Sequence, residues 1–186
     1  MKRTMSAVLI AALFATLAAP ALRAADFVWL EGEAARTIPD QMSTGGWSRP
    51  EYISERTLLM INLNGRQVDE SLPADGLVIG YEFQAPSAGA YEAWNRVVFE
   101  NIRAPFEWRV NDGEWQRNSQ EKQPISNVQE LSFWNPIGWT RMGETELRKG
   151  ANTLQIRLTK QVDEKGKTAA LRYVSDAICL HKGAWL

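Results

Sequence analysis

Three acidic residues near the two ends of the chain have the type and spacing of ligands for a hard metal cation. Glu31 and Glu33 lie two residues apart in segment 27–35, which reads as a first strand, so their side chains share one face. Asp176 lies in the last predicted strand, 170–180. Calcium takes about six to eight oxygen ligands, and paired carboxylates are costly without a cation. We predict a calcium site formed by Glu31 or Glu33, or both, with Asp176 and backbone carbonyls; the alternative is a set of solvated surface acids.

Catalytic chemistry has little support in the residue types. The single histidine, His181, follows the last predicted strand, so a histidine-based triad or a multi-histidine metal site is missing. The 22 acidic residues supply many carboxylate pairs, and geometry alone would select one for glycoside hydrolysis. We therefore expect that the protein is not an enzyme.

The first residues have the pattern of a secretory signal. Lys2 and Arg3 precede the apolar run 7–19, and small residues follow. We predict a signal peptide over 1–24, cleaved after Ala24, with Ala21 as the competing site, and one domain over 25–186. The product is expected to be exported to the periplasm or the extracellular space. No cysteine lies near the cleavage point, so no membrane anchor is expected.

Charge and cysteine content limit the partners and the covalent structure. Removal of the three basic residues of the signal leaves 18 basic residues against 22 acidic ones, a net charge of −4. This balance argues against nucleic acid as a partner. Cys179 is the one cysteine, so no intramolecular disulfide forms, and we expect it to be a small buried hydrophobic residue in a monomer.

Alternating apolar residues predict strands joined by short turns. Segments 77–83 and 90–100 flank a Pro-Ser-Ala-Gly turn and are predicted to form a hairpin. A second hairpin is predicted where 106–110 precedes an Asn-Asp-Gly turn. Trp108 and Trp115, on its two strands, are interpreted as core residues because large aromatics dominate sheet packing.

The remaining pattern predicts an all-β protein. Segment 57–63 is a candidate strand, and 153–159 alternates after a glycine turn. Strand 170–180 changes parity, which predicts a bulge at 175–177. No segment has a sustained helical period. We expect a jelly-roll β-sandwich of two antiparallel sheets in which the first and last strands lie side by side.

Four motifs occur in the order seen in a known family of domains. They are the opening Glu31-Gly32-Glu33-Ala34, the segment PSAGAYEAWNR at 86–96, the unit at 139–158, and the ending YVSDAI at 173–178. With them, segment 28–180 resembles carbohydrate-binding modules of families 6 and 35. The resemblance implies a jelly roll that binds glycans without catalysis and usually holds a structural calcium ion. The sequence departs from the family pattern in an unmatched insert at 49–75 and in Ser175, where a ligand-binding asparagine would precede Asp176.

Five residues are candidates for the ligand-binding site. The resemblance places Trp139 where these modules carry a ligand-stacking aromatic, just before a strand. Trp47 follows two glycines and Trp134 precedes Asn-Pro, so all three are predicted to lie at a loop rim. The alternative platform is the sheet face with Trp94 and Arg96, and the competing interpretation of Trp139 is that it plugs one end of the sandwich.

The functional hypothesis is an exported, non-catalytic domain that binds polysaccharide or oligosaccharide through loop or sheet-face tryptophans. One alternative is a structural or protein-interaction sandwich without a sugar site. A second is a small glycan-active enzyme.

Overall fold

A computed structural model describes residues 26–47, 49–98, 104–119, 125–132 and 135–183. The predicted signal peptide and Trp134 lie outside the described residues. Among the described residues, no helix has the length and apolar character needed to cross a membrane.

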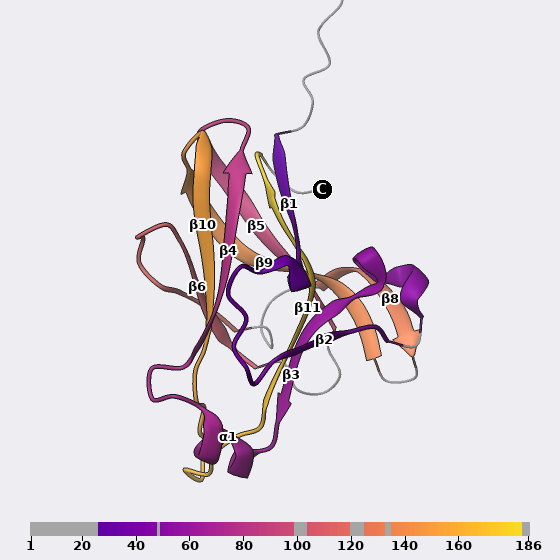
Figure 1. Cartoon of the computed structure of the whole chain (residues 1–186), viewed down its shortest axis with the longest axis vertical. Coiled ribbons are helices and arrows are strands. Elements are labelled where there is room, and N and C mark those ends of the chain that lie inside the picture. Colours follow the sequence, from indigo (N-terminus) through magenta and orange to yellow (C-terminus); the bar gives the residue numbers. More distant parts are fainter. Residues whose placement is uncertain (1–25, 48, 99–103, 120–124, 133–134, 184–186) are drawn as a thin grey trace, which may run out of the picture.

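The chain forms two antiparallel sheets, which confirms the predicted β-sandwich (Figure 1). The larger sheet has the order β2-β3-β11-β5-β9-β8, with β1 also paired to β11, and the smaller has the order β4-β10-β6-β7. The strands of the larger sheet are β1 (Phe27–Glu31), β2 (Ser43–Gly45), β3 (Leu58–Leu63), β5 (Gly89–Val98), β8 (Ile125–Ser132), β9 (Asn135–Leu147) and β11 (Leu171–His181). Those of the smaller sheet are β4 (Leu77–Ala85), β6 (Phe106–Val110), β7 (Gln116–Asn118) and β10 (Gly150–Leu158). The described helices are α1 (Gly65–Ser71) and three 3₁₀ turns, η1 (Gly32–Ala34), η2 (Pro50–Tyr52) and η3 (Ser54–Arg56).

The first and last strands pair as predicted. β1 runs antiparallel to β11, with Phe27 opposite His181 and Glu31 opposite Ala177. The predicted bulge is also present, because the pairing of β11 with β5 shifts register between Ser175 and Ala177. One expectation is wrong: Glu33 lies in η1, beyond the end of β1, and therefore does not share a strand face with Glu31.

Two short turns carry the chain from one sheet to the other. β4 pairs with β10, whereas β5 pairs with β9 and β11, so the predicted hairpin of segments 77–83 and 90–100 is wrong. The turn before Gly150 likewise joins β9 of the larger sheet to β10 of the smaller one. Alternation indicates a strand but does not identify its partner.

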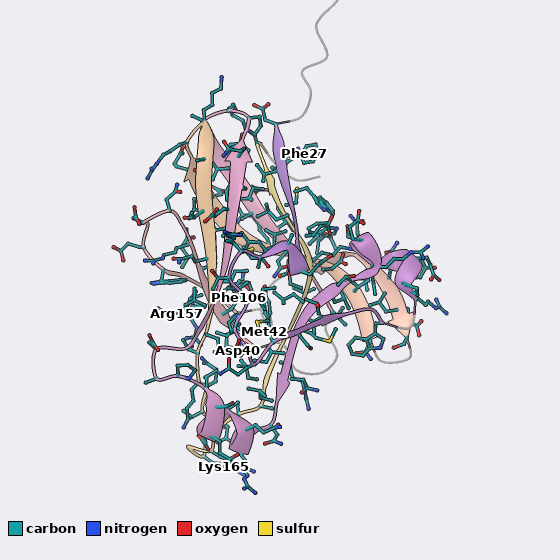
Figure 2. The ribbon with its side chains drawn as sticks, viewed as in Figure 1. Phe27, Asp40, Met42, Phe106, Arg157 and Lys165 are labelled. Atoms are coloured by element: carbon teal, nitrogen blue, oxygen red, sulfur yellow. The ribbon has the colours of Figure 1, made fainter. Side chains whose placement is uncertain are left out.

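The main core lies between the sheets. Its centre contains Trp108 and Ile156, both fully buried, and Phe106 lies between the two layers (Figure 2). Trp115 does not belong to this core, contrary to the prediction. β7 begins one residue later, with Gln116 opposite Trp108, so Trp115 follows the turn and stacks with the guanidinium groups of Arg109 and Arg157.

A second apolar cluster lies on the outer face of the larger sheet. It contains Leu58, Val98 and Ile137, together with Ile53 from the segment 50–56 and Leu131 from the edge strand β8. Figure 1 shows β8 and the short helices of this segment on the side of the sheet away from β4 and β10. The cluster therefore covers one part of the outer face, whereas Phe27 and Trp29 of β1 are exposed.

Candidate functional site

Four neighbouring strands place two rows of side chains on the outer face of the larger sheet. The first row crosses β1, β11, β5 and β9 as Trp29, Cys179, Trp94 and Arg141. The second row is Glu31, Ala177, Arg96 and Trp139 in the same strand order. Residues two apart in a strand share a face, so both rows point to the same side. We call Trp29, Trp94 and Trp139 the aromatic platform.

Trp139 lies within strand β9, so its predicted position in a loop is wrong. Its side chain is only 6% exposed and packs with Trp94, Ala177 and Cys179. The edge of the Trp29 ring meets it at a centroid distance of 5.4 Å and an interplanar angle of 72°. Trp139 therefore lies in the sheet-face platform, largely covered by its neighbours, and does not plug an end of the sandwich. Cys179 is buried in the same cluster, which confirms the prediction that it is a small buried hydrophobic residue.

The other two predicted rim residues do not join the platform. Trp47 packs against the second apolar cluster, and Trp134 lies outside the described residues. The sequence interpretation missed Trp29, which is 41% exposed. The sequence contained an indication of this role, because Trp29 is two residues before Glu31 in the first predicted strand and therefore shares its face.

A cavity of about 430 Å³ adjoins the platform. Trp29 and Trp139 line it from the platform, and residues of the segment 51–54 and of strand β8 line it as well. The polar groups that line it include Tyr52, Ser54, Arg96 and Gln129. The cavity thus combines ring surface with hydrogen-bonding groups.

A buried ion pair connects the walls of this cavity. Arg96 Nη1 donates to Asp176 Oδ2 at 2.6 Å, and the exposed fractions of the two side chains are 13% and 0%. The same nitrogen donates to Tyr52 O at 2.6 Å, and Nη2 donates to Gln129 Oε1 at 2.8 Å. The second oxygen of Asp176 accepts the Ser54 backbone N–H at 2.9 Å.

The predicted carboxylates lie near one another, with different environments. Oε1 of Glu31 accepts from Trp29 Nε1 at 2.6 Å and from Ser54 Oγ at 2.9 Å. Burial raises the pKa of Glu33, and the negative charges of Glu31 and Asp176 raise it further. Burial also raises the pKa of Asp176, although the hydrogen bond and the charge of Arg96 act in the opposite direction.

No calcium site is evident among the described residues, although two of the predicted carboxylates have unpaired oxygens. Oε2 of Glu31 and Oε2 of Glu33 are buried without a hydrogen-bond partner among the described residues, and such oxygens suit calcium. Asp176, however, is engaged by Arg96 and Ser54. Within the described ranges, no group of three or more acidic, histidine or cysteine side chains is placed to hold a metal ion. The three-carboxylate arrangement is therefore not formed.

Comparison with known proteins adds information on the fold. No family model matches the chain, and no curated protein matches it either. Among solved structures, it is similar to a family 35 carbohydrate-binding module from Clostridium thermocellum, with a TM-score of 0.54 and 15% identity over 83% of this chain and 98% of that one. It is also similar to the C-terminal CBM6 module of LamC, a marine laminarinase from Zobellia galactanivorans, with a TM-score of 0.51 and 14% identity over 84% of this chain and 100% of that one.

A third match is to a larger enzyme. The chain covers 29% of a GH26-CBM35 β-(1,4)-mannanase from Podospora anserina, with 88% of this chain aligned, a TM-score of 0.51 and 14% identity. The first two of these matches span nearly all of the other chain and are themselves carbohydrate-binding modules. The fold is therefore the β-sandwich of family 35 and family 6 carbohydrate-binding modules, as the motifs predicted.

Proposed function

We propose that this chain is a non-catalytic carbohydrate-binding domain whose site is the aromatic platform with its adjoining cavity. The observation that carries the proposal is the joining of Trp29 and Trp139 to a polar-lined cavity of about 430 Å³ on one sheet face. The similarity of the fold to carbohydrate-binding modules supports the same conclusion.

Trp29 is the ring best placed to stack on a sugar. It is 41% exposed, and Phe27, two residues earlier in β1, is 52% exposed on the same side. In Figure 2 the Phe27 side chain projects from β1, away from β4. A pyranose face that stacks on an indole removes apolar area from water, which contributes about 25 cal/mol per Å² to the binding free energy. One such contact therefore contributes a few kcal/mol. Gln129 and Ser54 can then hydrogen-bond to hydroxyl groups.

Replacement of Trp29 with alanine tests this assignment. We expect W29A to lose retention on a glycan affinity gel that holds the parent protein, with a small change in melting temperature because the ring is partly exposed. The matched control is W115A, which removes a half-buried tryptophan from the outer face of the other sheet. A W29A protein that is retained as strongly as W115A would contradict the proposed site.

Calcium is a separate proposal about stability. We propose that a cation held by Glu31 and Glu33, with backbone carbonyls, would neutralise their buried oxygens and stabilise the fold by mass action. Added calcium is then expected to raise the melting temperature of chelator-treated protein, and the double variant E31Q/E33Q should not respond. An equal melting temperature with and without calcium, together with no metal in the purified protein, would refute the site.

A further inference from the structure

The ion pair of Arg96 and Asp176 joins four parts of the chain that are distant in sequence. Arg96 comes from β5 and Asp176 from β11, and their partners Tyr52, Ser54 and Gln129 come from the segment 50–56 and from β8. Both terminal nitrogens of the arginine and both oxygens of the aspartate are used in these contacts. The pair therefore connects strands β5 and β11 to both elements, segment 50–56 and strand β8, that line the cavity beside the platform.

The segment that the pair holds has a backbone conformation that needs support. Directly after Ser54, Glu55 and Arg56 have φ values of 44° and 59°. Residues other than glycine occupy this left-handed region at a cost, and they stay there where the surrounding contacts determine the conformation. The bonds from Tyr52 O to Arg96 and from the Ser54 amide to Asp176 are contacts of this kind.

We propose that Arg96 and Asp176 are positioning residues of the carbohydrate site, which hold segment 52–54 and Gln129 in place beside the aromatic platform. This inference rests on the proposed function. Asp176 is fully buried and Arg96 is committed to protein acceptors, so the pair acts through the cavity wall that it holds. Arg96 thus has a different role from the direct ligand contact that was predicted from the sequence.

The test compares sugar retention with hydrogen exchange of the Ser54 amide. R96K keeps the positive charge but loses the planar fork that reaches Asp176, Tyr52 and Gln129 together. We expect about tenfold weaker retention and faster exchange at Ser54. R157K is the matched control, because Arg157 forms a partly buried ion pair of 2.7 Å with Glu107 on the other sheet. It should change neither measurement.

A milder variant keeps the test informative if R96K does not fold. Q129A leaves the ion pair intact and removes only the bond from Arg96 to strand β8. It is expected to weaken retention by less than about tenfold, and retention equal to that of the parent would contradict the positioning of Gln129 by Arg96. The proposal is overturned if R96K binds sugar as the parent does. It is also overturned if R96K loses binding while Ser54 exchange is unchanged, since Arg96 would then contact the sugar directly.

The same experiment separates this inference from the proposed function. If the parent protein is retained on no glycan, the proposed function fails, whereas the exchange measurement still reports on the cavity wall. Faster Ser54 exchange in R96K and D176N, with no change in R157K, then supports the positioning role. Unchanged exchange in both variants overturns it.

Discussion

Tyr173 shows how polar groups are accommodated between the two sheets. Its hydroxyl accepts a bond from Asn95 Nδ2 at 2.9 Å, and Asn95 Oδ1 accepts from Ser175 Oγ at 2.7 Å. All three side chains are buried. Burial raises the pKa of Tyr173 to about 12, although the hydrogen bonds from Ser175 and Asn95 lower it.

We expect this tyrosine to make the protein sensitive to alkali. In the unfolded chain a tyrosine loses its proton near pH 10, whereas native Tyr173 keeps it until about pH 12. The contribution of Tyr173 to the free energy of unfolding is therefore complete below pH 10. It is lost as the pH rises through 12, and the total loss is about 3 kcal/mol. Urea unfolding between pH 9 and 11.5 measures the slope.

The variant Y173F identifies the source of that slope. It should be less stable at pH 8, since Asn95 loses a partner, yet its stability should fall less steeply with pH. The pKa values of Tyr81 and Cys179 are also raised by burial, so part of the slope is expected to remain. Equal slopes for Y173F and the parent would show that Tyr173 does not contribute.

Some residues of the site were predictable from sequence and others were not. The parity of Trp94 and Arg96 placed them on one face, and a bulge placed Asp176 near the first strand. Trp139 was misplaced because residues 137 to 140 of β9 are all buried, which removes the alternation that marks a strand. The bond between Arg96 and Asp176 spans 80 residues, so no local pattern indicates it.

Helix α1 is a whole element that was not predicted from the sequence. The pair Asn64-Gly65 is a common turn dipeptide, but here Asn64 caps the helix by accepting the Gln67 N–H at 3.0 Å. Gln67 Oε1 accepts the Asn64 N–H in return, at 2.9 Å. The spacing of Asn and Gln was a capping-box signal, and seven residues are too few to reveal a helical period.

The cap gives a prediction for this element. N64A is expected to lower the free energy of unfolding by about 1 kcal/mol, because the N–H of Gln67 loses its acceptor. E70A is the control, since it removes the exposed Arg66–Glu70 pair of the same helix and should cost less than about 0.5 kcal/mol. Urea unfolding compares the two, and equal costs would mean that the cap is not stabilising.

Strands were more predictable than their partners. The alternation in β4, β6, β10 and the first part of β5 agrees with their observed burial. The connection from β4 to β5 was nevertheless misassigned, because in a sandwich a short turn can either close a hairpin or cross between sheets. Tertiary contacts between residues far apart in the sequence decide whether the turn closes a hairpin or crosses between the sheets. A local sequence pattern carries no information about those contacts.

At the scale of the whole molecule, export remains a prediction. We expect the mature chain to begin at Ala25, to have a net charge of −4 and to migrate as a monomer without an intramolecular disulfide. Mass spectrometry and N-terminal sequencing of protein from its native source check this. Retention of Met1 in that material would contradict the signal-peptide interpretation.

The place of β11 in the larger sheet determines when the molecule can fold. This strand pairs with β1, β3 and β5, yet it follows every other described strand in the sequence. Before residues 171–181 appear, β1 and β3 have no strand to join them to β5, and the floor of the aromatic platform is missing. Pairings over such sequence distances form slowly. The sandwich can therefore close only after residues 171–181 have been synthesised, and a truncation that removes β11 is expected to leave an unfolded chain instead of a shortened domain.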